Sequence, residues 1–270
     1  DIGQGTAVLV RTRKHLLVYD TGPAYAREGD AGQRIVAPLL RARGETRIDL
    51  LMLTHRDTDH VGCAASLHAA WPVLAWSSSL DDAHPLRRLA RQHSTCEAGQ
   101  SWTWDGVRFD VLHPQAGDAA RERRPNPLSC VLRIAAPDGT SALLTGDIEA
   151  TQEAALVQRL GEGLRSQVLL VPHHGSRTSS TEVFLDTLKP QVAVVQAAYR
   201  SRFGHPNPEV LARYHGRGIE VVRTDRCGAW IWAQGKASCT RDVRRRYWHW
   251  GATAAGADVA TPRAGGERGR

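Results

Sequence analysis

The sequence has few cysteines, few aromatic residues and no long hydrophobic run. Its five cysteines are an odd number without a CxxC pair, which argues against a zinc cluster built on thiolates. Most of the cysteines are expected to be buried and unpaired, and the alternative is a disulfide, with Cys227 and Cys239 as the candidate pair. No apolar stretch approaches the ~18 residues that a membrane-spanning helix needs. With 41% hydrophobic and 23% charged residues, the composition instead predicts a soluble globular domain.

Positive charge is concentrated towards residue 270. Residues 241–270 hold seven arginines against three acidic residues, a net charge of +4, so residues 1–240 carry only +3 of the total of +7. From about residue 251 the chain is mostly small residues and arginine, with little to bury. We expect one domain over residues 1–240 and a basic, disordered tail over residues 241–270. Aromatic residues beside the tail's arginines would stack on nucleic-acid bases or pack back on the domain.

Short strands alternate with helices along the domain. Unbroken apolar runs, typical of strands covered on both faces, occur at residues 50–53, 142–144, 168–171 and 192–195. Helical spacing of apolar residues occurs at 35–43, 149–160 and 181–188, and Asn207 followed by Pro208 starts a further helix. Residues 6–10 and 15–19 predict a hairpin, and strands near 221–222 and 230–232 close the pattern. This alternation predicts an α/β fold.

Histidine and aspartate gather in the loop that follows the first of these buried strands. Four potential metal ligands fall within six residues, namely His55, Asp57, Asp59 and His60. A loop can fold such side chains around a cation, whereas a strand or helix would spread them over different faces. A solvated polar turn is the alternative, but it does not explain so many ligand types directly after a buried strand. We expect a metal site here.

Three later strands also end in histidine or aspartate. Asp147 lies in a Thr-Gly-Asp turn after the 142–144 strand. The pair His173 and His174 follows the 168–171 strand, and His205 follows the 192–195 strand. Each of these signals alone fits an ordinary loop. Together they place donors at four strand ends, and a mixed oxygen and nitrogen set without thiolates suits Mn²⁺ or Zn²⁺.

These motifs resemble a known family. His-x-Asp-x-Asp-His followed by Thr-Gly-Asp and Pro-His-His-Gly-Ser is similar to the metallo-β-lactamase superfamily, and more narrowly to the C-terminal domain of ComEC-type competence proteins, which internalise DNA. The narrower likeness also includes residues 1–5, 126–133 and 204–206, and it extends to about residue 233. The resemblance implies an αββα sandwich, with two central mixed sheets flanked by helices and metals at the edge shared by the sheets.

The resemblance also implies roles for individual residues. Two divalent ions, Mn²⁺ or Zn²⁺, would be bridged by Asp147. Asp59 would orient the attacking water, His173 or His174 would protonate the departing oxygen, and Asp20 would orient a ligand. The implied metal ligands are His55, Asp57, Asp59, His60, Asp147, His173 and His205.

The sequence departs from the family pattern at three places, one of which is Thr6, where the subgroup often has an acidic residue. Asp57 stands where the broad superfamily has a second histidine, although aspartate there suits the ComEC-type subgroup. The region that usually supplies a further histidine contains Asn126 and Ser129 instead. These two side chains would hydrogen-bond substrate or form a plain turn, and His113 could replace the missing imidazole.

The function that the resemblance implies is a metal-dependent deoxyribonuclease that degrades the non-imported DNA strand during natural transformation. Arg200 and Arg202 would grip neighbouring phosphates, or form a merely solvated loop. The alternatives are a metallo-hydrolase for another ester and a non-catalytic DNA-binding or gating module with a degenerate metal site. The partners would be DNA and the rest of a polytopic membrane channel protein, with this domain, which has no transmembrane segment, on the extracytoplasmic face of the bacterial inner membrane.

Overall fold

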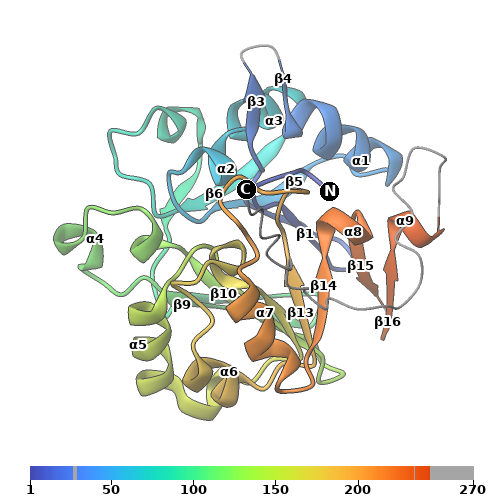
Figure 1. Ribbon diagram of the computed structural model, residues 1–270. Coiled ribbons are helices and arrows are strands. Elements are labelled where there is room, and N and C mark those ends of the chain that lie inside the picture. The colour runs from blue at the N-terminus through green and yellow to red at the C-terminus, as the bar shows by residue number, and fades with distance from the viewer. Residues whose placement is uncertain (27–28, 234, 244–270) are drawn as a thin grey trace, which may run out of the picture.

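Two sheets packed face to face form the centre of the protein (Figure 1). The computed structural model describes residues 1–26, 29–233 and 235–243. One sheet has the order β1-β2-β5-β6-β7 and the other the order β14-β13-β12-β11-β10-β9-β8. The first contains β1 (Val8–Arg11), β2 (Leu16–Tyr19), β5 (Ile48–Leu53), β6 (Val73–Ser78) and β7 (His93–Thr95). The second contains β8 (Ser101–Trp104), β9 (Val107–His113), β10 (Val131–Ala135), β11 (Ser141–Leu144), β12 (Val168–Leu170), β13 (Val192–Val195) and β14 (Glu220–Arg223).

Helices and small hairpins surround these sheets. The hairpins pair β3 (Ala24–Ala26) with β4 (Gly29–Asp30) and β15 (Trp230–Ala233) with β16 (Lys236–Cys239). The α-helices are α1 (Ala37–Ala42), α2 (Thr58–Val61), α3 (Ala64–Ala70), α4 (Asp118–Arg121), α5 (Ala150–Leu160), α6 (Glu182–Leu188), α7 (Pro208–His215), α8 (Thr224–Cys227) and α9 (Thr240–Val243). The other helical turns are the π-helical η1 (Gly32–Val36) and the 3₁₀ turns η2 (Pro85–Leu89), η3 (Asn126–Leu128), η4 (Gly161–Leu164) and η5 (Pro172–Gly175).

Alternating side chains of the first sheet build two separate cores. Leu16 and Val18 of β2 pack with α1 and α3, whereas Leu17 and Tyr19 of the same strand face the second sheet. This is the period-two alternation of a strand buried on both faces. The first sheet therefore lies between a helix layer and the other sheet, and Figure 1 shows α1 and α3 on that outer side.

The second sheet is covered in the same way on its outer face. Leu143, Leu169 and Ala193, from three neighbouring strands, pack against α5, α6 and α7, with Phe184 fully buried between them. The helix-spaced apolar residues at 149–160 and 181–188 thus supply this layer, and Asn207 caps α7 by accepting a hydrogen bond from the Glu209 N–H. The predicted αββα sandwich is confirmed.

Parallel strands bring the predicted ligand loops to one edge. β5 runs parallel to β2 and β6, and β11 to β14 run parallel to one another in the second sheet. The loops that follow β5, β11 and β12 therefore leave their sheets at carboxyl ends, where ligand-binding residues of α/β proteins gather.

The expectation that most cysteines are buried and unpaired is wrong, because four of the five form disulfides. The bridge considered between Cys227 and Cys239 is present, and a second joins Cys96 to Cys130. Cys63 is a buried free thiol. Residues 240–243 form α9, and the rest of the tail predicted to be disordered, residues 244–270, lies outside the described part of the chain.

Candidate metal centre

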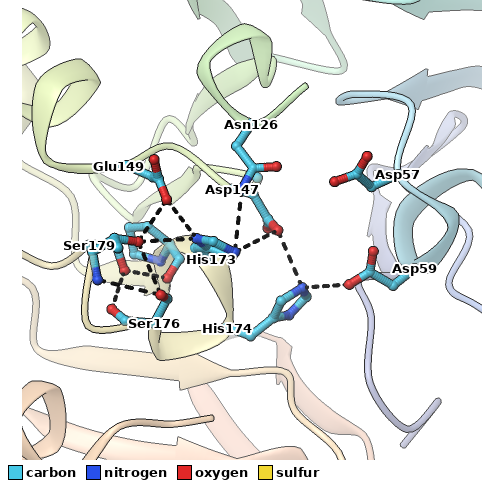
Figure 2. Close-up of polar contacts among 12 residues, drawn as sticks. Asp57, Asp59, Asn126, Asp147, Glu149, His173, His174, Ser176 and Ser179 are labelled. Atoms are coloured by element: carbon cyan, nitrogen blue, oxygen red, sulfur yellow. Dashed lines mark hydrogen bonds and ion pairs between the residues drawn. The ribbon is translucent and has the colours of Figure 1, made fainter. Parts of the chain in front are cut away.

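The loop after β5 turns directly into α2 and carries the first four donors. Asp57 precedes α2 with an extended backbone, so Asp59 and His60 fall in the first turn of the helix. His55 and His60 are buried, whereas Asp57 and Asp59 are partly exposed. Figure 2 shows the carboxylates of Asp57 and Asp59 directed towards the loops of the second sheet. The segment thus presents imidazoles inside the protein and carboxylates at its surface.

The N-terminal segment holds the backbone of Asp59 in place. The Thr6 N–H donates to the Asp59 carbonyl oxygen at 3.0 Å. This close approach requires glycine at position 5, because the φ angle of Gly5 is +143° and a Cβ there would lie 2.3 Å from the same carbonyl oxygen. A larger residue would displace the Asp59 loop.

A buried aspartate fixes the orientation of His60. Asp20 Oδ2 lies 2.7 Å from His60 Nδ1, and both side chains are fully buried. Thr54 donates its backbone N–H and its hydroxyl to the same carboxylate at 2.7 and 2.8 Å. Because the Nδ1 proton is directed at Asp20, the Nε2 lone pair of His60 is left for a cation. Asp20 thus contacts His60 as an orienting residue would, and its orienting role stays a prediction.

Asp147 lies between donors from both sheets. Its backbone N–H donates to the Ser129 hydroxyl at 3.0 Å, which fixes the turn that follows β11. Its Oδ1 is 3.1 Å from His60 Nε2. Its Oδ2 is 3.9 Å from His55 Nε2 and 3.8 Å from His173 Nε2. The two oxygens of one carboxylate therefore face different imidazoles, which is what a bridging ligand requires.

Two consecutive left-handed residues point their imidazoles into the site. His173 has φ 49° and ψ 43°, and His174 has φ 54° and ψ 19°. Such a backbone costs roughly 1–3 kcal/mol per non-glycine residue and is kept where the surroundings enforce it. His174 Nδ1 lies 2.8 Å from the Gln196 carbonyl oxygen, so its Nε2 faces Asp59 Oδ2 at 3.1 Å. His173 Nδ1 lies 3.3 Å from Glu149 Oε1.

Four side chains offer donor atoms close enough to share one ion. Asp59, His60, Asp147 and His174 each supply one atom, and these atoms all lie within 4.8 Å of one another. Figure 2 shows Asp147 and His174 meeting Asp59 across the gap between the loops. His55 adjoins this group, with its Nε2 3.7 Å from Asp57 Oδ2. The structure thus brings together the donors of three loops that are far apart in the sequence.

The donor set fits a divalent cation. Among the described residues, His55 Nε2, His60 Nε2 and Asp147 Oδ1 are buried without a hydrogen-bond partner. The last two are 3.1 Å apart but do not have the geometry of a hydrogen bond. Buried polar atoms are normally satisfied, and these three are nitrogen and oxygen ligands that Mn²⁺ and Zn²⁺ accept. Divalent cations bound at this site would satisfy all of them.

Neighbouring imidazoles keep the carboxylates ionised against the effect of burial. Burial alone would raise the pKa of Asp147, but the adjacent His60 and His174 hold that pKa well below its ordinary value. Burial would also raise the pKa of Asp59, yet the hydrogen bond with His174 lowers it. Burial would lower the pKa of His60, but Asp147 and Asp20 raise it well above its ordinary value. The carboxylates are therefore anions, the form that binds metal, and a cation would compete with protons on His60.

His205 lies beside the four-residue group rather than in it. Its ring centroid is 5.6 Å from that of His173 and 6.2 Å from that of His174. Burial, together with these two imidazoles, lowers the pKa of His205 to about 4. The imidazole is therefore neutral at physiological pH and next to the ligand loop. Its expected role as a metal ligand stays a prediction.

The residues that replace the superfamily histidine have different surroundings. Asn126 Nδ2 lies 3.4 Å from His173 Nε2, at the mouth of the site. Ser129 is fully buried, and its hydroxyl contacts His55 Nδ1 at 3.3 Å. The expectation that Ser129 binds substrate is wrong, because its hydroxyl supports two ligand loops and has no exposed surface. His113 is engaged with the Pro127 carbonyl oxygen at 2.7 Å and does not replace the missing imidazole.

Sequence reasoning missed the residues that support His173. Glu149 Oε1 accepts a hydrogen bond from the Thr178 hydroxyl at 2.7 Å and also caps the start of α5. The Thr178 hydroxyl in turn lies 3.4 Å from His173 Nδ1. A carboxylate two residues after Asp147 was a signal in the sequence, but its helix-capping position gave an ordinary explanation. Only the folded chain brings it to the imidazole.

Two further surfaces adjoin the ligands. A cavity of about 570 Å³ opens beside His55 and has Arg56 and Arg123 in its lining. Arg200 and Arg202, predicted to bind phosphate, are exposed in the loop before His205.

Comparison with known proteins gives the following matches. Residues 1–198 match the family described as the metallo-β-lactamase superfamily. Competence protein ComA of Neisseria gonorrhoeae is 37% identical over 250 residues, which are 92% of this chain and 33% of that protein. ComE operon protein 3 of Bacillus subtilis is 30% identical over 249 residues, 84% of this chain and 31% of that protein. The chain thus spans about a third of the length of these relatives.

Solved structures show the same fold at low sequence identity. The metallo-β-lactamase fold protein YhfI of Bacillus subtilis superposes with a TM-score of 0.53 at 13% identity, covering 82% of this chain and 88% of that one. In the described part of the chain, every helix is too short or too polar to cross a bilayer.

Proposed function

The chain belongs to the metallo-β-lactamase superfamily, and from that premise we propose that it is a metal-dependent deoxyribonuclease domain of a DNA-uptake protein. The convergence of Asp59, His60, Asp147 and His174 within 4.8 Å carries the metal chemistry. The similarity to proteins named for competence supports DNA as the substrate. The chain covers only about a third of those relatives, so the activity is proposed for this domain alone.

The donors divide into two groups that share Asp147, and each group suits one divalent ion, Mn²⁺ or Zn²⁺. Asp59, His60 and His174 would hold one ion, and His55 and Asp57 would hold the other. Such ions neutralise charge on a phosphodiester and lower the pKa of water towards neutrality. Both groups contain buried atoms that lack a hydrogen-bond partner in the described structure, which supports two positions rather than one.

The protein's own side chains would orient the attacking water, donate a proton to the departing oxygen and bind the substrate. Asp59, partly exposed and hydrogen-bonded to His174, would orient the attacking water. His173 is held through its Nδ1 by Glu149 and Thr178, so its Nε2 would deliver a proton to the departing oxygen. Asn126 beside His173 would donate a hydrogen bond to the substrate. Arg200 and Arg202 would bind phosphates on either side of the scissile bond.

The same relatives support a proposal for the cellular setting. We place the domain in a polytopic DNA-channel protein, on the extracytoplasmic face of the bacterial inner membrane, where it would degrade the strand that is not imported. The two disulfides of this chain agree with such a setting, since disulfides persist in oxidising compartments.

Cleavage of labelled DNA tests the nuclease. Purified protein is incubated with 5′-labelled single-stranded DNA and Mn²⁺ or Zn²⁺, beside Asp59→Ala and Asp147→Ala variants. Asp49→Asn is the matched control, because Asp49 is also buried but bonds Leu16 N–H and Arg47 at the opposite end of β5. Metal-dependent cleavage that survives in the control and is lost in both site variants supports the proposal. DNA binding without turnover in wild type would contradict it.

One observation favours a second candidate, a DNA-binding or gating module. Asn126 rather than an imidazole lies at 3.4 Å from His173, so the set of ligands known for the broad superfamily is incomplete here. The same assay separates the two, because a module would bind the labelled strand in every variant that folds and would cleave it in none. Hydrolysis confined to small carboxylic esters would instead indicate a different hydrolase.

A further inference from the structure

An exposed loop of aromatic and arginine residues lies beside the metal centre. We propose that this loop, residues 199–203, is a binding platform for single-stranded DNA, in which Tyr199 and Phe203 stack on bases and the two arginines contact phosphates. This inference rests on the proposed function, because it names the form of DNA that reaches the same site. Stacking on aromatic rings suits single strands, whose bases are accessible, and it tolerates any sequence.

Exposure sets this loop apart from the rest of the described surface. Tyr199 and Phe203 are 54% and 55% exposed. Six large hydrophobic side chains are exposed among the described residues, and these two fall within five residues of each other, next to the ligand loops. An isolated exposed hydrophobic residue needs no explanation, but exposed aromatic rings grouped beside a functional site indicate a binding surface.

An arginine guanidinium lies over each of the two rings. The Arg200 guanidinium carbon is 5.3 Å from the Tyr199 ring centroid, and that of Arg202 is 4.7 Å from the Phe203 ring centroid. In the described part of the chain, neither arginine has a carboxylate partner. Their charge is therefore available to DNA phosphates, and the pairing of ring and guanidinium is the combination found on surfaces that bind single strands.

A row of rings connects the loop to the metal ligands. Phe203 stacks on His205 with ring centroids 5.9 Å apart. His205 lies 5.6 Å from His173 and 6.2 Å from His174 between ring centroids. A base stacked at Phe203 would thus lie one or two nucleotides from a phosphate placed at the ligands. This row also gives His205 a use that does not require it to bind metal.

The loop is anchored at its centre and again just beyond its C-terminal end. The Ser201 hydroxyl donates to Gln4 Oε1 at 2.9 Å, and the Gly204 N–H donates to the Ser201 carbonyl oxygen at 3.0 Å. Beyond His205, the Asn207 N–H donates to the Gly175 carbonyl oxygen at 2.8 Å. Rings presented on a loop that is already fixed lose little conformational freedom on binding, which favours affinity.

A membrane surface is the competing ligand, because aromatic and arginine residues also gather at lipid interfaces. The row of rings favours DNA, since it continues from the loop towards the catalytic ligands rather than along the outer surface. The experiment therefore measures binding to both.

Equilibrium binding tests the platform without cleavage. Fluorescence anisotropy of labelled dT12 is measured with the full chain in EDTA, for wild type, Tyr199→Ala, Phe203→Ala and Phe203→Trp. We expect each alanine variant to weaken binding about 10-fold or more, the tryptophan variant to bind as wild type does, and a 12-bp duplex to bind more weakly than dT12. Val183→Ala is the matched control, because Val183 is 64% exposed on α6, and it should leave dT12 affinity unchanged.

Three results would overturn the proposal that this loop binds single-stranded DNA. The first is that both alanine variants bind dT12 as tightly as wild type. The second is that the duplex binds more tightly than the single strand. The third is that the alanine substitutions abolish binding to anionic phosphatidylglycerol vesicles and leave dT12 binding intact. Because binding is read in EDTA and cleavage by the wild type is read separately, an inactive nuclease and an absent platform give different results.

Discussion

Asp20→Asn is the substitution that most sharply tests how the protein prepares His60 for metal. In the wild type, Asp20 Oδ1 accepts the Thr54 N–H at 2.7 Å and Oδ2 faces His60 Nδ1 at 2.7 Å. Asparagine has nearly the same shape, so packing is preserved. If its oxygen keeps the Thr54 bond, its NH₂ group faces Nδ1, and Nδ1 must then accept a hydrogen bond. The imidazole proton moves to Nε2, which can no longer bind a cation.

The alternative orientation of the amide is also costly. If the oxygen turns to His60, the NH₂ group faces the buried Thr54 N–H, and a donor is left unsatisfied at a cost of about 1–3 kcal/mol. Loss of a carboxylate that orients a metal-binding histidine typically weakens metal binding about 10- to 100-fold. At 1.4 kcal/mol per tenfold change, we expect Asp20→Asn to lose about 1.4–2.8 kcal/mol of metal-binding free energy.

Competition with a chromophoric zinc chelator measures this loss directly. Asp49→Asn is the control, because it neutralises a buried carboxylate on the same sheet away from the ligands, and it should retain the wild-type affinity for Zn²⁺. Circular dichroism of the metal-free proteins checks that both variants are folded. A folded Asp20→Asn protein that binds Zn²⁺ within twofold of wild type would refute the reasoning, since His60 would then not depend on its buried partner.

Three further substitutions probe other parts of the structure. Gly5→Ala would place a Cβ 2.3 Å from the Asp59 carbonyl oxygen, so it should weaken Zn²⁺ binding about 10-fold in the same competition assay, and unchanged affinity would show that the loop adapts. Burial and the Arg87 guanidinium lower the pKa of His93 from 6.5 to about 4. Between these pH values the unfolded chain binds more protons, so the free energy of unfolding should fall as pH falls, by less than ~1.4 kcal/mol per pH unit because His93 is partly exposed. The free energy of unfolding of His93→Gln, measured with urea, should change less with pH over this range. An unchanged pH dependence would show that other groups cause it. Phe184→Ala removes a fully buried ring and should cost about 3–5 kcal/mol in urea unfolding, whereas a loss below ~1 kcal/mol would contradict the packing described.

The fold and the ligand loops were predictable because they depend on local patterns. Apolar runs such as residues 50–53 and 168–171 mark strands buried on both faces, and β5 and β12 fall there. Histidine and aspartate residues at the ends of these strands indicated where a metal site would lie. The αββα layering itself came from family resemblance, since periodicity predicts an α/β fold but not how its sheets stack.

The supporting contacts were not predictable because they join residues far apart in the sequence. Ser129 contacts His55 across 74 positions, and its burial follows from the meeting of two sheets. The bridge between Cys96 and Cys130 likewise depends on strands of different sheets lying together. Local sequence also gave no sign that His173 and His174 adopt left-handed backbones, because that conformation is enforced by their surroundings.

Metal content of the purified protein is the most direct test of the central claim, that loops from both sheets converge on divalent cations. Protein dialysed against Zn²⁺ and then against metal-free buffer is analysed by inductively coupled plasma mass spectrometry, beside Asp147→Asn. We predict two ions per wild-type chain and fewer than one in the variant, which loses the ligand facing both donor groups. A folded wild-type chain that retains only trace metal would contradict the claim.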